Sequence, residues 1–266
     1  MRRAPGCRGL KRIRIDDALV EKSLCGSIAE AMAAIDERIV TVNGAIATTY
    51  AHLVAPEDEL AIRVKPRYIG RGGVKLESAI KEFGLDFKGK SVIDVGASTG
   101  GFTDCALQHG ARTVLAIDVG KNLLHEKIAA DPRVTVVEKL NARDIGQLVR
   151  ANDPRFADLF DIAVVDLSFI SIREVLESIL TALRNGSVLV LLIKPQFEAS
   201  KAEADRGGGV ISDSGVHQRV CDEVTRLVES AECRVEGVKP SPILGHDGNQ
   251  EFLLVAKCAR VEPSTQ

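Results

Sequence analysis

A glycine-rich turn is the most distinctive local feature of the sequence. The segment SVIDVGASTGGF, residues 91–102, begins as an apolar strand pattern and passes through closely spaced glycines into a helix pattern. Glycines at such a turn let the backbone approach a ligand at the carboxyl end of a strand. Their positions, Gly96, Gly100 and Gly101, lack the GxGxxG spacing that is typical of dinucleotide-binding proteins. We therefore expect a small-molecule site of another kind; the alternative is a purely structural turn.

Acidic residues near this turn indicate which ligand it binds. Asp94 ends the first strand, where a carboxylate suits an amine or a cation better than a pyrophosphate. S-adenosylmethionine carries both an ammonium and a sulfonium, so we predict it as the cofactor. Asp118 ends the next strand, where such folds place an acid that accepts from ribose hydroxyls. Residues 141–143 follow the third strand and could flank the adenine, while Asp144 beside them is equally a candidate helix cap. The predicted cofactor contacts are Asp94, Gly96, Ala97, Ser98, Thr99, Gly100, Gly101, Phe102, Asp118, Asn141, Ala142 and Arg143.

Two lysines and two acids occur where strands of the pattern begin or end. Lys194 directly follows the apolar run 188–193, and a charge in that position is costly unless it is paired or functional. The alternative is a lysine that emerges into solvent. For Lys75, which precedes the first strand, that alternative is as strong as a functional role. Asp166 ends the fourth strand and Glu251 opens the last one.

The elements that must position these residues alternate between strands and helices from residue 69 to 260. Apolar strands alternating with amphipathic helices predict a doubly wound α/β domain with a mostly parallel sheet. The predicted strands are 91–96, 113–118, 134–139, 162–167, 188–194, 234–239 and 251–258, and the clearest helices are 102–109, 172–184 and 214–231.

A smaller α+β unit precedes this domain, over residues 12–64. A first helix has Asp16 as its candidate cap, and a second runs from the N-cap Ser27 to about residue 37. Residues 39–42 and 60–64 have strand patterns, and Asn43-Gly44 predicts a tight turn between strands. Residues 65–68, Lys-Pro-Arg-Tyr, are predicted to be a linker because proline disfavours helix before it.

Composition narrows the function classes. The 266 residues carry a net charge of −2, so RNA affinity requires local basic patches. The basic start, residues 1–14, is either such an arm or a solvated tail, and no apolar stretch follows it as in a secretory signal. The longest apolar run is too short to span a bilayer, so we predict no membrane insertion. Six scattered cysteines without a CxxC pair argue against a metal site and predict reduced thiols in the cytoplasm.

Five segments, in order, resemble the motifs of one family. They are GRGGVKL (70–76), DVGASTGGF (94–102), DLSFIS (166–171), IKPQFE (193–198) and GNQEF (248–252). They look like the TlyA proteins, called haemolysin A or ribosomal-RNA cytidine 2′-O-methyltransferases, whose catalytic domain is similar to FtsJ/RrmJ ribose methyltransferases. The resemblance spans Arg12 to Lys257. It implies methyl transfer from S-adenosylmethionine to a ribose 2′-hydroxyl of a cytidine in ribosomal RNA, with ribosomal RNA or ribosomal subunits as partners. Monomer and weak dimer both stay open.

The resemblance also implies a catalytic tetrad of Lys75, Asp166, Lys194 and Glu251. A ribose hydroxyl is a poor nucleophile that must be oriented and must lose its proton. A free lysine is protonated at neutral pH, but burial and a neighbouring ammonium favour the neutral amine. We therefore predict Lys194 as the base or the group that stabilises the alkoxide, with Lys75 favouring loss of its proton. Asp166 would hold Lys194, and Glu251 would orient Lys75 or the hydroxyl.

The N-terminal unit resembles the alpha-L fold, the RNA-binding fold of a small-subunit ribosomal protein. Two positions depart from that family: Ile28 replaces an arginine after the helix cap, and Glu37-Arg38 replace a glycine at the end of the second helix. In the linker, Tyr68 stands where the TlyA family often has tryptophan. The predicted RNA contacts are Arg12, Arg14, Arg38, Arg67 and Arg71.

Three other functions compete with this prediction. A non-catalytic RNA-binding or ribosome-assembly factor would keep the fold without the chemistry. A haemolysin-like cytolysin would need a membrane-active segment, which the sequence does not suggest. A base methyltransferase commonly carries a catalytic cysteine or an Asn/Asp-Pro-Pro-aromatic motif at the fourth strand, where this chain has Asp166-Leu-Ser-Phe.

Overall fold

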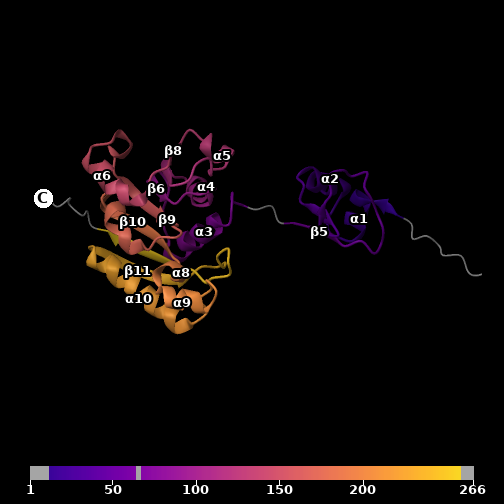
Figure 1. Ribbon diagram of the computed structural model, residues 1–266. Coiled ribbons are helices and arrows are strands. Elements are labelled where there is room, and N and C mark those ends of the chain that lie inside the picture. The colour runs from indigo at the N-terminus through magenta and orange to yellow at the C-terminus, as the bar shows by residue number, and fades with distance from the viewer. Residues whose placement is uncertain (1–11, 64–66, 259–266) are drawn as a thin grey trace, which may run out of the picture. The chain divides into compact units, whose positions relative to one another are not determined.

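The computed structural model describes residues 12–63 and 67–258, and it divides the chain into two compact units that meet between Pro66 and Arg67. Figure 1 shows both units along the chain, and each is described by itself. The α/β class of the larger unit is confirmed.

The first unit packs two short helices on small antiparallel sheets. Its core is formed by apolar side chains of both helices and the strands, with Ile15, Leu19 and Ile35 fully buried. In chain order its elements are β1 (Ile13–Arg14), α1 (Ile15–Glu21), α2 (Ile28–Asp36), β2 (Val40–Val42), β3 (Ala45–Ile46), β4 (Leu53–Val54) and β5 (Leu60–Ile62).

The predicted N-cap of α2 is confirmed, since the Ser27 side chain accepts a hydrogen bond from the Glu30 amide at 3.2 Å. The predicted cap of α1 is wrong. The helix begins at Ile15, so Asp16 already lies in its first turn, where it forms a 2.6 Å ion pair with Arg14. That guanidinium lowers the pKa of Asp16.

The second unit is built on a seven-stranded sheet of order β11-β12-β10-β9-β6-β7-β8. The neighbours from β10 to β8 are parallel, and β12 runs antiparallel to both β10 and β11. The strands are β6 (Ser91–Val95), β7 (Thr113–Asp118), β8 (Val134–Glu138), β9 (Phe160–Val165), β10 (Leu183–Ile193), β11 (Cys233–Pro240) and β12 (Phe252–Cys258). All seven predicted strands are present, and β9 and β10 begin earlier than predicted.

Helices cover both faces of this sheet (Figure 1) because successive side chains of each strand point to opposite faces. In β6, Ile93 packs into one core with helices α6, α7 and α10, whereas Val92 packs into the other with α3, α4 and α5. The α-helices of this unit are α3 (Gly72–Phe83), α4 (Gly101–Gln108), α5 (Glu126–Ala129), α6 (Ile145–Arg150), α7 (Leu176–Leu180), α8 (Pro195–Glu198), α9 (Lys201–Arg206) and α10 (Ser214–Ser230). Three 3-10 helices are η1 (Ala142–Asp144), η2 (Pro154–Phe156) and η3 (Ile172–Glu174).

Two sequence predictions fail here. The predicted helix 172–184 is shorter: η3 and α7 end by Leu180, and Leu183 is already paired with Phe160 in the sheet. Sheet pairing of a buried leucine therefore overrides the helical pattern. The expectation of reduced thiols is wrong for Cys233 and Cys258, which face each other across β11 and β12 and form a disulfide, whereas Cys25, Cys105 and Cys221 are free.

Candidate active site

The carboxyl ends of three neighbouring strands and the start of a fourth form one edge of the sheet. Val165 of β9 is paired with Val95 of β6, and Leu191 of β10 is paired with the same Val165. Ile193 at the end of β10 lies opposite Phe252 at the start of β12. The residues just beyond these pairs are Asp166, Lys194 and Glu251. The register therefore brings three of the four predicted catalytic residues to the same edge.

Lys194 and Asp166 form the first ion pair of this edge. The ammonium Nζ lies 2.6 Å from Asp166 Oδ1 and also donates to Ser168 Oγ at 2.9 Å. The Lys194 side chain is 10% exposed and that of Asp166 is 21% exposed, so the pair lies at the rim of the buried region. The amine is thus held by an ion pair with Asp166 and a hydrogen bond to Ser168.

Lys75 and Glu251 form a second, more deeply buried pair. Lys75 projects from the first turns of α3, and its Nζ donates to Glu251 Oε2 at 2.5 Å. The side chains are only 9% and 4% exposed. Glu251 is enclosed further by the backbone of Gly245, where an added Cβ would lie 2.7 Å from Glu251 Oε1. The four predicted residues are thus present as two lysine–carboxylate pairs.

A cavity of about 310 Å³ lies beside the first of these pairs. The glycine-rich turn and Asp166 both contribute to its wall, and apolar residues at the ends of β7 and β8 form another side of the cavity. Gly96 has φ +88°, and a Cβ there would lie 2.4 Å from the Asp166 carbonyl oxygen, so only glycine fits between the turn and the loop after β9. The residues that line the cavity are Val95, Gly96, Ser98, Ile117, Asp118, Val119, Leu123, Leu140, Ala142, Asp166, Leu167, Ser168 and Phe169.

Asp118 lies where this cavity meets a narrower hollow lined by Ala97, Leu123, Val136 and Val137. Its two carboxylate oxygens accept from the amides of Ser98 and Gly120, each at 2.8 Å. Each oxygen keeps a further lone pair, so the carboxylate is able to accept hydrogen bonds from hydroxyl groups. The adjoining apolar walls suit a flat heterocycle such as adenine.

Asp94 lies deeper than its predicted role requires. Its carboxylate is fully buried in β6, and Oδ2 accepts from Thr103 Oγ1 of α4 at 2.6 Å. Among the described residues, Oδ1 has no hydrogen-bond partner. Burial raises the pKa of Asp94 to about 7, the Thr103 hydroxyl opposes that shift, and the nearby charge of Asp166 adds to it. An orphaned carboxylate oxygen behind the glycine turn fits an approaching cation.

Other predicted cofactor residues support the turn instead of lining the cavity. Phe102 is 3% exposed in the core on the α3 side, and Gly100 faces Leu124 and Ile128. Gly101 packs against the backbone of residues 69–73, and the Thr99 carbonyl accepts from His125. Asn141 caps η1 through the Arg143 amide, and the Arg143 guanidinium pairs with Glu174. Asp144 occupies the N-cap position of α6, as the alternative predicted, but its side chain makes no capping hydrogen bond.

The predicted RNA-contacting arginines differ in how free they are. In the first unit Arg12 and Arg38 are exposed, and Arg14 is paired with Asp16. Arg38 has φ +57°, so an arginine occupies the left-handed position where the alpha-L family has glycine. Residues 1–11 of the basic arm lie outside the described part of the chain.

In the second unit Arg67 pairs with Glu77 and stacks over the Tyr68 ring, 5.2 Å from its centroid. Arg71 donates to the Leu244 carbonyl. Tyr68 itself is buried against the helix α3 backbone, where a Cβ on Gly73 would clash with its ring. Both arginines are therefore engaged in intramolecular contacts, which an RNA ligand would have to share or replace.

Three aromatic and hydroxyl side chains at the site were missed by sequence reasoning. Phe169 is 90% exposed beside the cavity with φ +64°, and its ring lies 5.2 Å from that of Phe197. Ser168 contacts Lys194. The sequence shows all three inside the matched motifs, yet nothing in their types or spacing indicated that they meet.

Across residues 12–63 and 67–258, none of the helices has both the length and the apolar character needed to cross a bilayer. Those ranges also contain no group of three or more His, Cys, Asp or Glu side chains placed to hold a metal ion.

Comparisons with known proteins match both units to known families. Residues 68–258 match the model of the FtsJ-like methyltransferases, and residues 13–60 match the S4 domain. The Bacillus subtilis protein YqxC is 39% identical over 92% of this chain and 85% of its own length. The 16S/23S rRNA (cytidine-2′-O)-methyltransferase TlyA of Mycobacterium tuberculosis is 34% identical over 92% of this chain and 89% of its own. A solved structure from Streptococcus thermophilus that carries the name hemolysin superposes with a TM-score of 0.70 at 34% identity, covering 94% of this chain and 90% of that one.

Proposed function

The chain belongs to the TlyA branch of the FtsJ-like methyltransferases, and on that premise we propose that it methylates the ribose 2′-hydroxyl of a cytidine in ribosomal RNA. The proposal rests on one observation above all. Two lysine–carboxylate pairs lie at the sheet edge, and Asp166 of one pair lines the same cavity as the glycine-rich turn. That arrangement can hold a hydroxyl group next to a bound methyl donor.

S-adenosylmethionine fits the residues around this cavity. Asp118 offers acceptors for ribose hydroxyls, and the apolar hollow beside it suits adenine. The turn at Gly96 leaves room for the backbone to follow the ligand closely, and the orphaned Asp94 oxygen suits the ammonium of the methionine end. The cofactor supplies an electrophilic methyl group on a sulfonium, and this transfer requires no metal ion.

In the proposed mechanism the protein orients the hydroxyl and removes its proton. Lys194 is the base, or the group that stabilises the developing alkoxide, and Asp166 and Ser168 fix its position. Lys75, held by Glu251, would donate to the same oxygen. Bound S-adenosylmethionine would supply the methyl group to the ribose oxygen, and the hydroxyl proton would pass to the Lys194 amine where Lys194 is the base, or to water where Lys194 stabilises the alkoxide.

Substrate RNA would be held by the S4 unit as well as by the catalytic unit. In the S4 unit we assign phosphate contacts to the exposed side chains of Arg12, Arg14 and Arg38. In the catalytic unit we assign them to Arg67 and Arg71. Phosphate contacts position a protein without specifying sequence, so selection of the cytidine would fall to the cleft around Lys194. An enzyme that acts on ribosomal RNA or ribosomal subunits would work in the cytoplasm.

The decisive test is to map 2′-O-methylated nucleotides in ribosomal RNA treated with the full chain and S-adenosylmethionine. New methylation on a cytidine ribose is expected for the wild-type protein and for Lys201→Ala, an exposed lysine control on α9. Lys194→Ala should lose at least about a hundredfold in rate, the typical contribution of a general base. Methyl groups found on base atoms, or full activity in Lys194→Ala, would refute the assignment.

Two rival functions give different results in simple assays. A non-catalytic assembly factor would bind ribosomal RNA without binding S-adenosylmethionine, as isothermal titration calorimetry can show. A cytolysin would release the contents of vesicles or erythrocytes when supplied as purified, nucleic-acid-free protein. We expect cofactor binding in the first assay and no release in the second.

A further inference from the structure

The loop after β9 and the segment after β10 are joined along their length by four side-chain contacts. Asp166 and Ser168 contact Lys194, and Phe169 of the loop lies against Phe197 of the other segment. At the far end, Glu198 of α8 contacts the loop again. The proposed reaction uses Lys194 and Asp166 but assigns nothing to Glu198.

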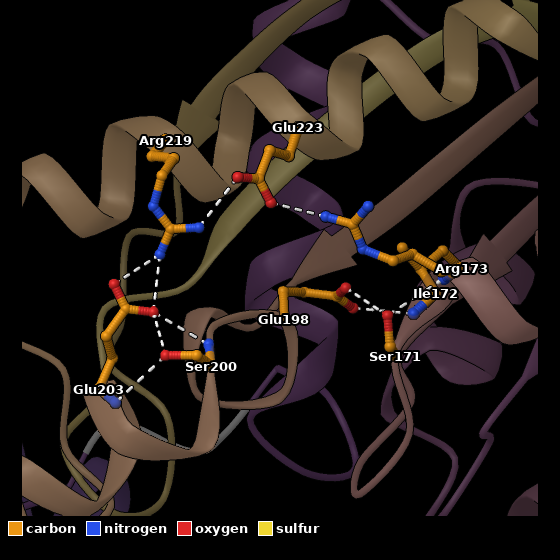
Figure 2. A network of polar contacts seen from close by, with 8 residues as sticks. All are labelled: Ser171, Ile172, Arg173, Glu198, Ser200, Glu203, Arg219 and Glu223. Atoms are coloured by element: carbon orange, nitrogen blue, oxygen red, sulfur yellow. Dashed lines mark hydrogen bonds and ion pairs between the residues drawn. The ribbon is translucent and has the colours of Figure 1, made fainter.

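Glu198 makes the last of these contacts with both of its oxygens (Figure 2). Oε2 accepts from Ser171 Oγ at 2.6 Å, and Oε1 accepts from the Ile172 amide at 2.8 Å. The carboxylate lies in a largely buried position, which raises its pKa. Hydrogen bonds to a carboxylate are among the stronger ones in proteins, and here they close the loop at the point where η3 begins.

The loop between Asp166 and Ile172 has no regular secondary structure and needs such closure. At one end the Asp166 amide donates to the Val95 carbonyl at 3.0 Å. Between the two ends, Phe169 adopts a left-handed conformation that is unfavourable for a residue with a side chain. A strained loop that is fixed at one end only would relax, and Ser168 would leave Lys194.

The surrounding ion pairs join the two segments only indirectly, through side chains of α10. Arg219 of α10 pairs with Glu203 at 2.7 Å and with Glu223 at 2.9 Å, and Glu223 pairs with Arg173 at 2.6 Å (Figure 2). These guanidinium groups are 41–45% exposed, so solvent weakens their contribution. Glu198 is therefore the contact best placed to keep the two segments in register.

We propose that Glu198 is a positioning residue for methyl transfer: it fixes the loop 166–172 so that Ser168 and Asp166 hold the Lys194 amine in its reactive orientation. The inference rests on the proposed function for its kinetic consequence, but the fixation of the loop is independent of it. Glu198 touches neither the ammonium of Lys194 nor the substrate. Its effect should thus appear chiefly in the rate of the chemical step, with a smaller effect on cofactor affinity because residues 166–169 also line the cavity.

The test compares Glu198→Ala with Glu198→Gln in the full chain. Alanine removes both acceptors, so kcat should fall about tenfold or more, in line with misplacement of a catalytic group. KM for RNA should stay within about twofold, and the Kd for S-adenosylmethionine should rise by a smaller factor than that by which kcat falls, because residues 166–169 also line the cavity. Glutamine can accept from Ile172 and donate to Ser171, so kcat should recover to within about threefold of wild type. Glu203→Gln, a matched change in the same segment, should leave all three constants unchanged.

Amide hydrogen exchange supplies a readout that does not need activity. Peptides that cover residues 166–172 should exchange faster in Glu198→Ala, with the rest of the sheet unchanged. If the wild-type protein transfers no methyl group, the proposed function fails, and faster exchange confined to this loop would still support the anchor.

Three results would overturn the proposal. One is a wild-type kcat in Glu198→Ala. Another is a loss shared by cofactor binding and by exchange across the whole second unit, which would make Glu198 a general fold residue. If Glu198→Ala does not fold, Ser171→Ala decides the matter, because it removes the donor to Glu198 Oε2: a wild-type kcat together with unchanged exchange of residues 166–172 would show that this contact does not hold the loop.

Discussion

Breaking the buried pair of Lys75 and Glu251 should destabilise the second unit strongly, and replacing both residues should not. The side chains are 9% and 4% exposed and 2.5 Å apart, so removal of one partner leaves the other buried and uncompensated. Such a change typically costs about 3–5 kcal/mol, whereas apolar replacement of both partners is close to neutral. For a unit of this size each kcal/mol shifts Tm by about 2–4 °C, so Lys75→Met and Glu251→Leu should each lower Tm by on the order of 10 °C.

Differential scanning calorimetry of four proteins tests this reasoning: wild type, both single variants and the double variant. We expect the double variant to melt near the wild-type temperature, to bind S-adenosylmethionine and to transfer no methyl group, which separates chemistry from stability. If the single variants had the same Tm as the double variant, water would have to reach the pair. A double variant that still methylated RNA would show that Lys75 and Glu251 have no part in catalysis.

Three further predictions follow from the charges and strain described above. Burial raises the pKa of Asp94 to about 7, so the stability that comes from keeping this acid neutral is complete below about pH 4 and is lost as the pH rises to 7. The free energy of unfolding of Asp94→Asn should therefore equal that of wild type near pH 4 and exceed it by on the order of 4 kcal/mol at pH 8. Urea unfolding across this pH range measures the difference. Arg38→Gly should be more stable than Arg38→Ala by about 1 kcal/mol, because only glycine relieves the left-handed strain, while both variants lose the same RNA affinity in filter binding. Asp166→Asn should raise the Kd for S-adenosylmethionine by about tenfold, because it leaves Lys194 as an uncompensated charge near the sulfonium. Lys194→Ala should leave that Kd unchanged or lower it. Equal effects of the two variants on the Kd measured by calorimetry would contradict this reasoning.

The sequence predicted the parts of the site that depend on strand ends. Lys194 and Asp166 follow continuous apolar runs, and parallel strands present their carboxyl ends at one edge, so their proximity is a consequence of fold class. Glu251 required the resemblance, because it starts a strand that runs the other way. Only the antiparallel pairing of Ile193 with Phe252 brings it beside Lys194.

Features that depend on packing between distant segments could not be predicted. Phe102 lies within the cofactor motif, but its helical position turns the ring into the core on the α3 side. Cys233 and Cys258 have no motif spacing, and they meet because β11 and β12 are neighbours. The contact of Glu198 with the loop after β9 likewise joins elements whose adjacency only the sheet order defines.

The pairing of each lysine with its own carboxylate explains how two amines can face a positively charged methyl donor. Two unit charges about 5 Å apart repel by on the order of 3 kcal/mol at an effective dielectric constant of 20, so a pair of bare ammonium groups would oppose cofactor binding. In this chain Asp166 cancels the charge of Lys194, and Glu251 cancels that of Lys75, so the four groups together are close to neutral. The amines nevertheless keep N–H donors for the hydroxyl oxygen, whose negative charge develops only as the methyl group moves. The site can thus stabilise that transient charge without repelling the sulfonium beforehand, which is the distinction between binding a transition state and binding a ground state.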